Sequence, residues 1–557
     1  MILLVPELLC KVMVKSFLNL LATRQSSILS GATVLMIAVF ASRFLGLIRD
    51  RLLVQNFNTS EAAIFFAAFR LPDLLFQILV FGSLSVAFIP VFAETLHKKG
   101  DEEAFKFASS ILNLSLLLFG VVVTLSIIFV APLNSLFVPG FQGEQKILTD
   151  QITQIILIAQ VILVVGTFFF GIAHTYQRFI IPALAPIFYN LGIIFGIVFL
   201  TKFFGMQGLG LGVVLGAFLH VVVQIPLIKS LGFQYKFTFD FFNSGVKDVF
   251  KLMSIRNIGL IAEQINETVG IALASILSYS SVTLLTFGQH LFAVPIGLFG
   301  ATIAQAALPV LSKEYARNEI ESFKITLLTT MHQILFLTLP AAAILIVLRI
   351  PVVRLVFGAD QFSWDDTVLT GRTVALFALG LAAQSIVLLL VRAFYAMKNT
   401  KIPVVASLIT VTVNIMLSSL FVLYMKLEVW SIGLAYSVSA IVNAIFLIYF
   451  LNRKIPGFNN TNLTIPILKM LTAASAAAFA LYIPMKSLDQ LVFDTTKTIN
   501  LIFLTGIASV VGISIYLLLV WLLDVKELTT FINLFKKFTK IKFSPDTQEM
   551  AEDTRKM

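Results

Sequence analysis

The chain has 557 residues, of which 58% are hydrophobic and only 12% are charged, and its mean hydropathy is +0.96. A soluble domain carries about 25% charged residues, so this chain has too few to cover a globule in water. The composition therefore excludes a soluble enzyme, a disordered protein and a fibrous protein, and predicts a polytopic membrane protein. The single cysteine, Cys10, excludes disulfides within the chain and cysteine-ligated metal sites.

Apolar stretches of about 20 residues, long enough to cross a ~30 Å hydrocarbon core, recur along the chain. About fourteen can be distinguished, at 27–48, 62–93, 106–131, 150–176, 180–202, 207–229, 250–277, 281–311, 325–350, 369–396, 402–424, 429–451, 465–485 and 499–523. We expect an all-α fold with an N-lobe (27–230) and a C-lobe (247–452) of six helices each. Two extra helices (465–523) follow, and amphipathic segments (1–26 and 524–557) flank the spans.

The basic residues between these stretches are unevenly distributed. One alternate set of connecting segments contains Lys98, Lys99, Lys106, Arg178, Lys229, Lys236, Lys313, Arg317, Lys398, Lys401, Arg453 and Lys454. The opposite set has few basic residues and an acidic loop with Asp360, Asp365 and Asp366. Because cytoplasmic loops carry the excess of Lys and Arg, we expect both termini in the cytoplasm. The same rule explains the net charge of +11, so we expect contact with membrane lipids and no nucleic-acid partner.

Three motifs recur in the same order at an offset of about 220 residues, which indicates an internal repeat. Phe81-Gly82 with Pro90 matches Phe299-Gly300 with Pro309, Pro182 matches Pro403, and Gly210-Leu211-Gly212 matches Gly433-Leu434-Ala435. Each copy contains six predicted helices. Because six is even, the two lobes are expected to be parallel repeats around a central cavity.

Charged side chains inside a bilayer are costly and usually face a cavity or a partner, so the few in this chain are candidate site residues. Arg43 and Arg49 are six positions apart on the first helix, about 120° and 9 Å apart. Arg70 lies early in the second helix, where Asp73 is a local candidate partner. His290 in the eighth helix is a candidate for titration, for anion contact or for structural packing.

The seventh helix carries a second group of charges. Glu263 and Glu267 are i, i+4 neighbours on one face, and Arg256 lies seven residues before Glu263 on the same stripe. Two acids on one membrane face require a cation, a proton or an arginine, so this group either couples an ion or braces the lobe. The first lobe and the lobe contact together are more cationic than anionic. This balance favours an anionic substrate, especially phosphate, which arginine binds in a bidentate fork.

The sequence contains no Gly-x-x-x-x-Gly-Lys-Ser/Thr phosphate loop and no soluble insertion large enough for a catalytic domain. We therefore expect a transporter and not an enzyme, with no cofactor. Transport would be secondary, driven by membrane potential, by a substrate gradient or by an ion gradient of Na⁺ or H⁺.

Four motifs in order resemble the MurJ (MviN) family of lipid II flippases. They are Ser42-Arg43-Phe44-Leu45-Gly46-Leu47-Ile48-Arg49-Asp50, then Phe65 to Leu75 with Ala87 to Pro90, then Pro295 to Ser312, and Arg392 to Pro403. Membership of the MOP exporter superfamily implies two six-helix lobes around a V-shaped cavity, with a lipid-tail groove formed by the last two helices. The resemblance also implies a bacterial cytoplasmic membrane protein that acts beside the cell-wall synthesis machinery. Its substrate would be an undecaprenyl-pyrophosphate-linked peptidoglycan precursor, moved to the outer leaflet by alternating access.

Residue by residue, Arg43 and Arg49 match the family's first-helix cavity arginines. His290 occupies the position of the family's eighth-helix arginine. The resemblance therefore implies that Arg43 and Arg49, helped by His290, neutralise the diphosphate. Arg70 and Arg256 are the candidates that compensate for lost cavity charges.

Three other positions depart from the family pattern. The acid usual early in the second helix falls at Ala63, with Glu61 close by. The family has an arginine and then an acid farther along that helix. In this chain these two positions fall near 76–77 and at Phe81, so neither charge is present. Asn414 falls at one expected ligand position of a sodium site known in some members, which makes it a candidate for ion coupling.

These departures keep two alternatives open within the superfamily. One is a flippase for another lipid-linked oligosaccharide. The other is a cation-coupled drug or metabolite antiporter, whose cavity would be expected to show lone acids in the first lobe, where only Asp73 lies. A membrane scaffold without transport activity is a third class, and dispensable cavity arginines would favour it.

Overall fold

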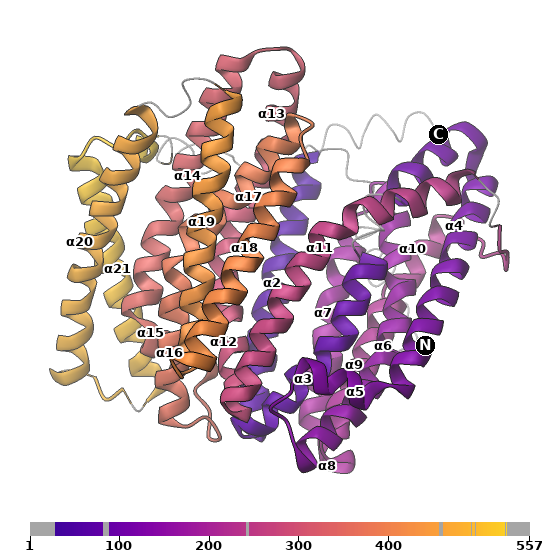
Figure 1. The fold of residues 1–557 in the computed structure, drawn as a ribbon, viewed down its shortest axis with the longest axis horizontal. Helices are drawn as coiled ribbons and strands as arrows, with labels where there is room; N and C mark the ends of the chain where they lie inside the picture. The colour runs from indigo at the N-terminus through magenta and orange to yellow at the C-terminus, as the bar shows by residue number, and fades with distance from the viewer. Residues whose placement is uncertain are drawn as a thin grey trace, which may run out of the picture.

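The computed structural model describes residues 28–81, 88–240, 244–455, 461–491, 493–495, 497–529 and 531. Its secondary structure in these ranges is helical and contains no strand, which confirms the all-α prediction (Figure 1). The predicted N-terminal segment 1–26 and most of the predicted tail 524–557 lie outside the described residues.

The helices follow one another closely along the chain. The first half contains α2 (Ile28–Asn56), α3 (Thr59–Phe76), η1 (Gln77–Phe81), α4 (Ile89–Ile128), α5 (Val130–Phe137), α6 (Gly143–Thr175), α7 (Ile180–Phe195), η3 (Gly196–Leu200), α8 (Thr201–Phe204), α9 (Gln207–Val222) and α10 (Ile225–Ser230). The second half contains α11 (Ser244–Leu277), α12 (Tyr279–Pro295), η4 (Ile296–Ala301), α13 (Thr302–Ala316), α14 (Ile320–Val347), α15 (Arg349–Phe357), α16 (Trp364–Leu379), α17 (Leu381–Ala396), α18 (Lys401–Ser419), η5 (Leu420–Tyr424), α19 (Trp430–Lys454), α20 (Thr461–Leu491) and α21 (Thr498–Leu522). The η elements are π-helical turns that continue the preceding helix.

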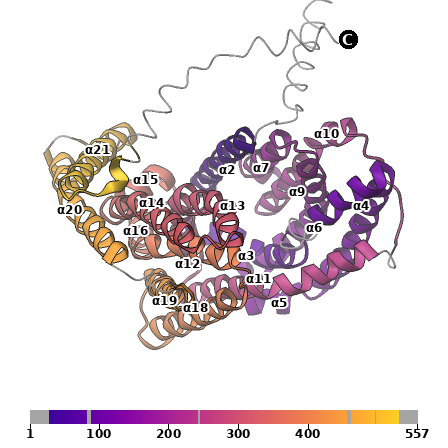
Figure 2. The ribbon, with the colours of Figure 1, turned by 90° about the horizontal axis from the view of Figure 1, so that it is seen from above.

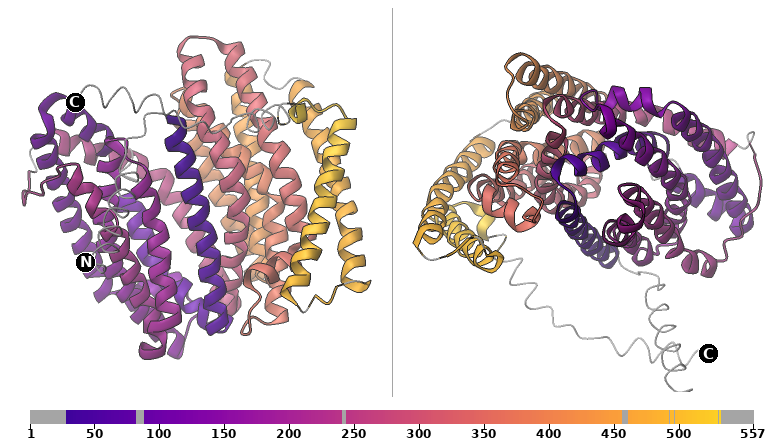
Figure 3. Two further views of the ribbon diagram at one scale, coloured as in Figure 1. Left: turned by 180° about the vertical axis from the view of Figure 1, so that it is seen from behind. Right: turned by 90° about the horizontal axis from the view of Figure 1, so that it is seen from below.

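The helices gather into two groups. One group contains α2–α10 and the other α12–α19, and α11 runs obliquely from the first toward the second (Figures 1 and 2). Seen from behind, α2 lies between the two groups (Figure 3). The last two helices, α20 and α21, pack on each other at the outer edge of the second group, far from the first (Figure 2). This arrangement agrees with the predicted two lobes and two extra helices.

The internal repeat is visible in the backbone. The π-helical turn η1 begins at Gln77 and η4 at Ile296, 219 residues later, while η3 and η5 begin 224 residues apart. Left-handed turn residues recur at the same spacing: Gln177 (φ 56°) corresponds to Lys398 (φ 56°), and Gly205 (φ 54°) to Lys426 (φ 51°). Backbone irregularities that recur at the offset of about 220 residues support the repeat independently of side-chain identity.

Most of the predicted spans correspond to single long helices. Among the described residues, eleven helices are long and apolar enough to cross a membrane, and α16 with α17, which meet at 44°, makes a twelfth if the pair is one span. The other two predicted spans coincide with α2 and α11, which have 29 and 34 residues. The total of fourteen crossings stays a prediction.

Helices α7 and α9 approach each other closely because glycines face each other along their contact. A Cβ atom on Gly212 would lie 2.6 Å from the Cα atom of Gly196, and one on Gly192 would lie 2.3 Å from the Cα atom of Gly216. Small residues let two backbones pack directly, which is a main source of helix association in membranes. The N-lobe core therefore depends on the absence of side chains at these positions.

Replacing Gly212 by alanine is expected to destabilise the N-lobe by about 1–3 kcal/mol, because the new methyl group overpacks the α7–α9 contact. The measurement is the thermal unfolding midpoint of the purified protein in detergent. Gly120→Ala is the matched control, since a Cβ atom there meets nothing within 4 Å. An unchanged midpoint for Gly212→Ala would contradict the close contact.

The segment after α21 docks onto the C-lobe. Glu527 forms an ion pair with His332 of α14 at 3.1 Å between Oε1 and Nδ1, and the two side chains are only 10% and 9% exposed. Burial alone would raise the pKa of Glu527, but the hydrogen bond from His332 and a backbone hydrogen bond outweigh it and hold this pKa below its usual value. His332 thus anchors the start of the tail.

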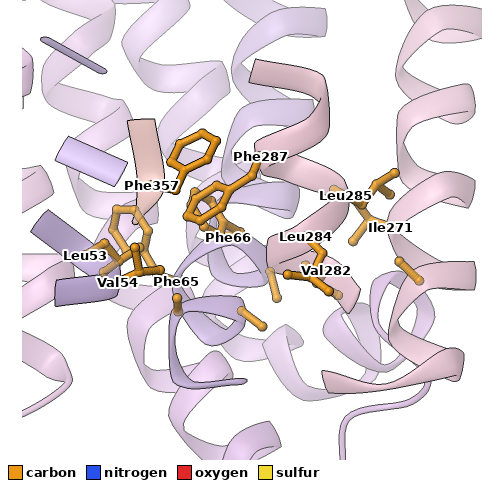
Figure 4. Close-up of a cluster of buried hydrophobic side chains, with 14 of the residues drawn as sticks. Leu53, Val54, Phe65, Phe66, Ile271, Val282, Leu284, Leu285, Phe287 and Phe357 are labelled. Carbon is orange, nitrogen blue, oxygen red and sulfur yellow. The ribbon is translucent and has the colours of Figure 1, made fainter. Parts of the chain in front are cut away.

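An apolar cluster joins the two lobes beside the C-terminal end of α2 (Figure 4). Phe66 of α3 meets Phe287 of α12 edge to face, with ring centroids 5.7 Å apart, and Phe287 stacks on Phe357 of α15 at 3.9 Å. Leu53 and Val54 of α2 are fully buried in the same cluster. This apolar contact lies toward the end of the molecule opposite the basic connecting segments. The two lobes therefore pack directly against each other at that end.

Candidate functional site

Arg49 and Asp50 of α2 connect to His290 of α12 across the lobe interface. Arg49 donates from Nε (3.0 Å) and Nη2 (2.8 Å) to Oδ1 of Asp50, and the other oxygen of Asp50 lies 2.6 Å from Nδ1 of His290. The Asp50 side chain is 1% exposed, whereas those of Arg49 and His290 are 16% and 35% exposed. A buried carboxylate thus holds together two of the three predicted cations of the first and eighth helices.

Arg43 reaches the same helix three residues farther along. Its Nη1 donates to the carbonyl oxygen of Ala293 at 2.7 Å, and its guanidinium lies over Gly297, where a Cβ atom would be 2.7 Å from Nη1. Within the described residues, Arg43 has no carboxylate partner, and it is exposed. Helices α2 and α12 run antiparallel, so Arg43, Arg49, Asp50 and His290 line one stretch of their contact. We call these four residues the interface cluster.

Asn190 of α7 supports the interface cluster from within the N-lobe. Its amide nitrogen donates to the carbonyl oxygens of Pro186 (3.1 Å) and Ser42 (3.4 Å), and its oxygen accepts from Nη1 of Arg49 at 3.4 Å. Because Asn190 is 8% exposed, these contacts fix the direction of the Arg49 side chain.

Arg70 joins the lobes in another way. Its Nη1 donates to Glu267 at 2.8 Å, Nη2 donates to the side chain (2.8 Å) and the backbone carbonyl (2.6 Å) of Gln264, and Nε donates to Thr268 at 2.9 Å. All four bonds run from α3 to α11, so the local pairing with Asp73 considered from the sequence is not the one that the structure contains. Asp73 instead accepts from Gln160 at 3.2 Å. With its side chain 5% exposed and four donor hydrogens engaged, Arg70 braces the two lobes.

The acidic pair on α11 divides between two environments. Glu267 accepts from Arg70, while Glu263 is exposed and makes no hydrogen bond among the described residues. Arg256 lies on the same helix, but its side chain is outside the described residues, so its predicted role on this stripe stays a prediction.

Asn414 lies in a polar helix contact. Its amide nitrogen donates to the side-chain oxygen of Asn266 on α11 at 2.5 Å, and its own oxygen accepts from Ser418 at 3.4 Å. The described part of the chain contains no group of three His, Cys, Asp or Glu side chains placed to hold a metal ion. The surroundings of Asn414 are therefore those of an interhelical hydrogen bond, and its assignment to ion coupling stays a prediction.

Glu61, which lies close to Ala63 in the sequence, caps the N-terminus of α3. Asn58 accepts from the backbone amides of Ser60 and Glu61 at 3.0 Å each, and Glu61 in turn accepts from the Asn58 amide at 3.0 Å. This reciprocal capping box begins α3. Glu61 therefore satisfies backbone donors at a helix end, at the edge of the apolar cluster.

Two residues of the site, Asp50 and Asn190, were not predicted from the sequence. Asp50 stands in the quoted first-helix motif, but adjacent helical positions point about 100° apart, so its pairing with Arg49 is not evident from spacing. Its second partner, His290, is 240 residues away. Asn190 carries no charge, and its only signal is an amide inside an apolar helix, which usually indicates a hydrogen-bonding partner.

The interface cluster can attract an anion. Arg43 has one backbone acceptor, and Arg49 keeps donor hydrogens beyond those used by Asp50, so both retain donors for a ligand. With one buried carboxylate against two guanidinium groups, the cluster is net positive before His290 is protonated. Arginines with free donors can donate hydrogen bonds to phosphate oxygens, whereas their positive charge repels organic cations.

Further hydrogen bonds join the lobes, in addition to those of the interface cluster and of Arg70. Among the described residues they connect Arg51 with Leu355 (2.6 Å), Thr59 with Asp366 (3.1 Å), Thr59 with Thr283 (2.7 Å), and Gly140 with Ser275 (3.2 Å). Arg43 lies 13 residues before the end of α2, about 20 Å along its axis. These bonds therefore reach from the end opposite the basic segments to about the middle of the molecule.

Comparison with known proteins gives a consistent result. The family model described as "Lipid II flippase MurJ" matches residues 57–504. A probable lipid II flippase MurJ of Bdellovibrio bacteriovorus is 29% identical over 466 residues, which cover 82% of this chain and 88% of that protein. One from Buchnera aphidicola subsp. Baizongia pistaciae is 26% identical over 462 residues, 82% of this chain and 90% of that protein.

Solved structures agree on the fold. A lipid II flippase MurJ in an inward closed conformation has a TM-score of 0.72 and 26% identity, and the match covers 87% of this chain and 98% of that chain. An inward-facing multidrug resistance MATE transporter of the MOP superfamily has a TM-score of 0.66 at 16% identity, covering 75% of this chain and 96% of that chain. The second likeness concerns the fold alone.

Proposed function

The chain belongs to the lipid II flippase MurJ family, and from this premise we propose that it moves lipid II from the cytoplasmic to the outer leaflet. It is a transporter and not an enzyme, and it is a multi-pass protein of the bacterial inner membrane. The curated relatives and the solved neighbour with the same description extend over most of this chain, so the activity concerns the whole fold and not a fragment.

The position of the interface cluster supports this proposal. The interface cluster places Arg43 and Arg49 on the contact between the lobes, held by Ala293 and Asp50 and still able to donate to a ligand. Bringing a diphosphate into the membrane interior is opposed by the loss of its hydration, and fixed guanidinium groups offset that cost. His290 adds a positive charge when it is protonated.

We propose that transport follows alternating access without ATP. The interlobe hydrogen bonds and the apolar cluster around Phe287 close one end of the molecule, and the basic connecting segments lie at the other end. If those segments face the cytoplasm, with both termini, the cluster is approached from the cytoplasmic side in this state. The driving force would be the membrane potential or an ion gradient of Na⁺ or H⁺, and the chain would work beside the enzymes that make and use the precursor.

The test is to express this chain in a bacterium depleted of its own lipid II flippase and to measure lipid II in each leaflet. We expect growth to be restored and lipid II to become accessible to a membrane-impermeant probe. Accumulation of lipid II in the inner leaflet despite normal membrane levels of the chain would refute the assignment. Rescue of a different lipid-linked oligosaccharide under the same conditions would identify that lipid as the substrate instead.

A further inference from the structure

Two adjoining cavities open at the end of the molecule opposite the basic connecting segments, near the α15–α16 and α20–α21 turns (lower left in Figure 1). Their volumes are about 400 Å³ and 380 Å³, within the range of small-molecule sites. Both are lined by Arg354, Trp364, Thr495 and Leu501, so they form one continuous recess. We call this recess the outer basic pocket.

Positive charge dominates the lining. Arg51, Arg349, Arg354 and Lys486 face two acids, Asp360 and Asp489. Basic residues are scarce in the connecting segments at this end, so the positive-inside rule does not account for four of them around one recess. Four positive side chains around one recess, at an end of the molecule where basic residues are otherwise scarce, indicate a ligand with negative charge.

The cations are positioned but not neutralised. Arg51 donates to the carbonyl oxygen of Leu355 at 2.6 Å, and Arg349 donates to that of Ile346 at 3.0 Å. The guanidinium of Arg354 lies over the Trp364 ring, 5.7 Å from its centroid. Throughout the described residues, no carboxylate forms an ion pair with any of the four cations. Backbone carbonyls and an aromatic face orient the three arginines, while most of their donors stay available.

The other wall of the recess is apolar. Tyr482 and Met485 of α20 and Leu501 and Leu504 of α21 line it. The same helix pair exposes large apolar side chains along its length, including Phe479, Ile483, Ile502 and Phe503. A ligand that fills the recess therefore meets cations at one side and a lipid-like surface at the other, which matches a phosphorylated headgroup followed by an acyl or prenyl chain.

We propose that the outer basic pocket binds the phosphate-bearing headgroup of a lipid at the outward end of the protein. It is separate from the interface cluster: Arg51 points from α2 to α15, whereas Asp50 points to His290 on α12. A transported diphosphate lipid and an anionic phospholipid of the outer leaflet share this chemistry. Only the identification of the former as ligand rests on the proposed function.

The experiment measures lipid binding by the full chain in detergent. The probes are undecaprenyl diphosphate, phosphatidylglycerol and, as a lipid without net charge, phosphatidylcholine. In the unchanged chain the pocket competes with the interface cluster, so every variant is built on an Arg43→Ala background. We expect Arg354→Ala/Lys486→Ala to weaken binding of at least one anionic lipid by about tenfold or more, since each lost charge-assisted contact is worth that much.

The matched control is Arg453→Ala/Lys454→Ala, which removes the same two charges at the basic end of α19. Thermal unfolding midpoints equal to that of the background protein verify that both double variants are folded. Loss of undecaprenyl diphosphate binding alone identifies a transported lipid as the ligand, and loss of phosphatidylglycerol binding identifies a leaflet lipid. If the pocket variant binds each of the three lipids as tightly as the background protein does, or if the control loses as much affinity, the proposal is overturned. Because binding and not flipping is measured, such a result would leave the proposed transport function intact.

Discussion

Replacing Arg49 by alanine is expected to abolish complementation of a lipid II flippase deletion. The substitution removes the guanidinium that faces the proposed diphosphate. It leaves the buried carboxylate of Asp50 with His290 as its one remaining partner among the described residues. Loss of one charge-assisted contact lowers affinity by about tenfold or more, and the uncompensated acid adds repulsion toward the anion. The measurement is colony formation after depletion, with membrane levels of the variant determined in parallel.

Three further variants separate substrate binding from folding. Arg43→Ala is expected to lose function at a normal membrane level, because Arg43 is exposed and, among the described residues, makes a single hydrogen bond, to Ala293. Arg49→Lys keeps the charge but loses the planar set of donors that Asp50 and Asn190 accept from, so we expect weak complementation. Arg317→Ala, an exposed arginine in the basic set, is the control and should complement fully. Full complementation by both Arg43→Ala and Arg49→Ala would remove the interface cluster from the transport mechanism.

Replacing Arg70 by alanine is expected to lower the free energy of unfolding by about 2–4 kcal/mol and to impair transport. The substitution deletes four hydrogen bonds between α3 and α11 and leaves a cavity where the side chain was 5% exposed. It also removes a link that favours the state in which the lobes meet at this end, so the equilibrium between transport states should shift. The measurements are the thermal unfolding midpoint in detergent and the leaflet distribution of lipid II.

The partners of Arg70 supply the controls. Glu267→Gln is expected to have a smaller effect, because Glu267 is 48% exposed and the amide oxygen still accepts from Arg70. Glu263→Gln, one turn away and without a hydrogen bond among the described residues, should leave the unfolding midpoint unchanged. An Arg70→Ala variant as stable and as active as the unchanged chain would contradict the role of Arg70 as an interlobe brace.

The helices could be located from the sequence because a bilayer imposes a length and a composition on each span. The predicted stretch 402–424, for example, corresponds to α18 with η5 at Lys401–Tyr424, and 429–451 to α19 at Trp430–Lys454. The offset of about 220 residues found in three weak motifs reappears in the π-helical and left-handed turns. Such features are local, so each depends on residues that are neighbours in the chain.

The site was only partly predictable. Arg43, Arg49 and His290 stood out because any polar side chain inside an apolar helix is conspicuous. The choice of partners was different: Asp73 is three residues from Arg70, yet Arg70 binds Glu267, 197 residues away. Glu61, which lies close to the position of the family's acid in the second helix, accepts a hydrogen bond at the N-terminus of its own helix.

From the amino-acid sequence we could predict the class of the protein, the positions of its spans, the repeat and the short list of intramembrane charges. These follow from composition and periodicity, which are properties of the chain in its solvent. Helix packing in three dimensions fixes which charges meet: Asp50 with Arg49 and His290, Arg70 with α11, and Arg51, Arg354 and Lys486 around one outward recess. Contacts of this kind depend on how helices far apart in the chain pack, and no spacing rule along one helix contains that information.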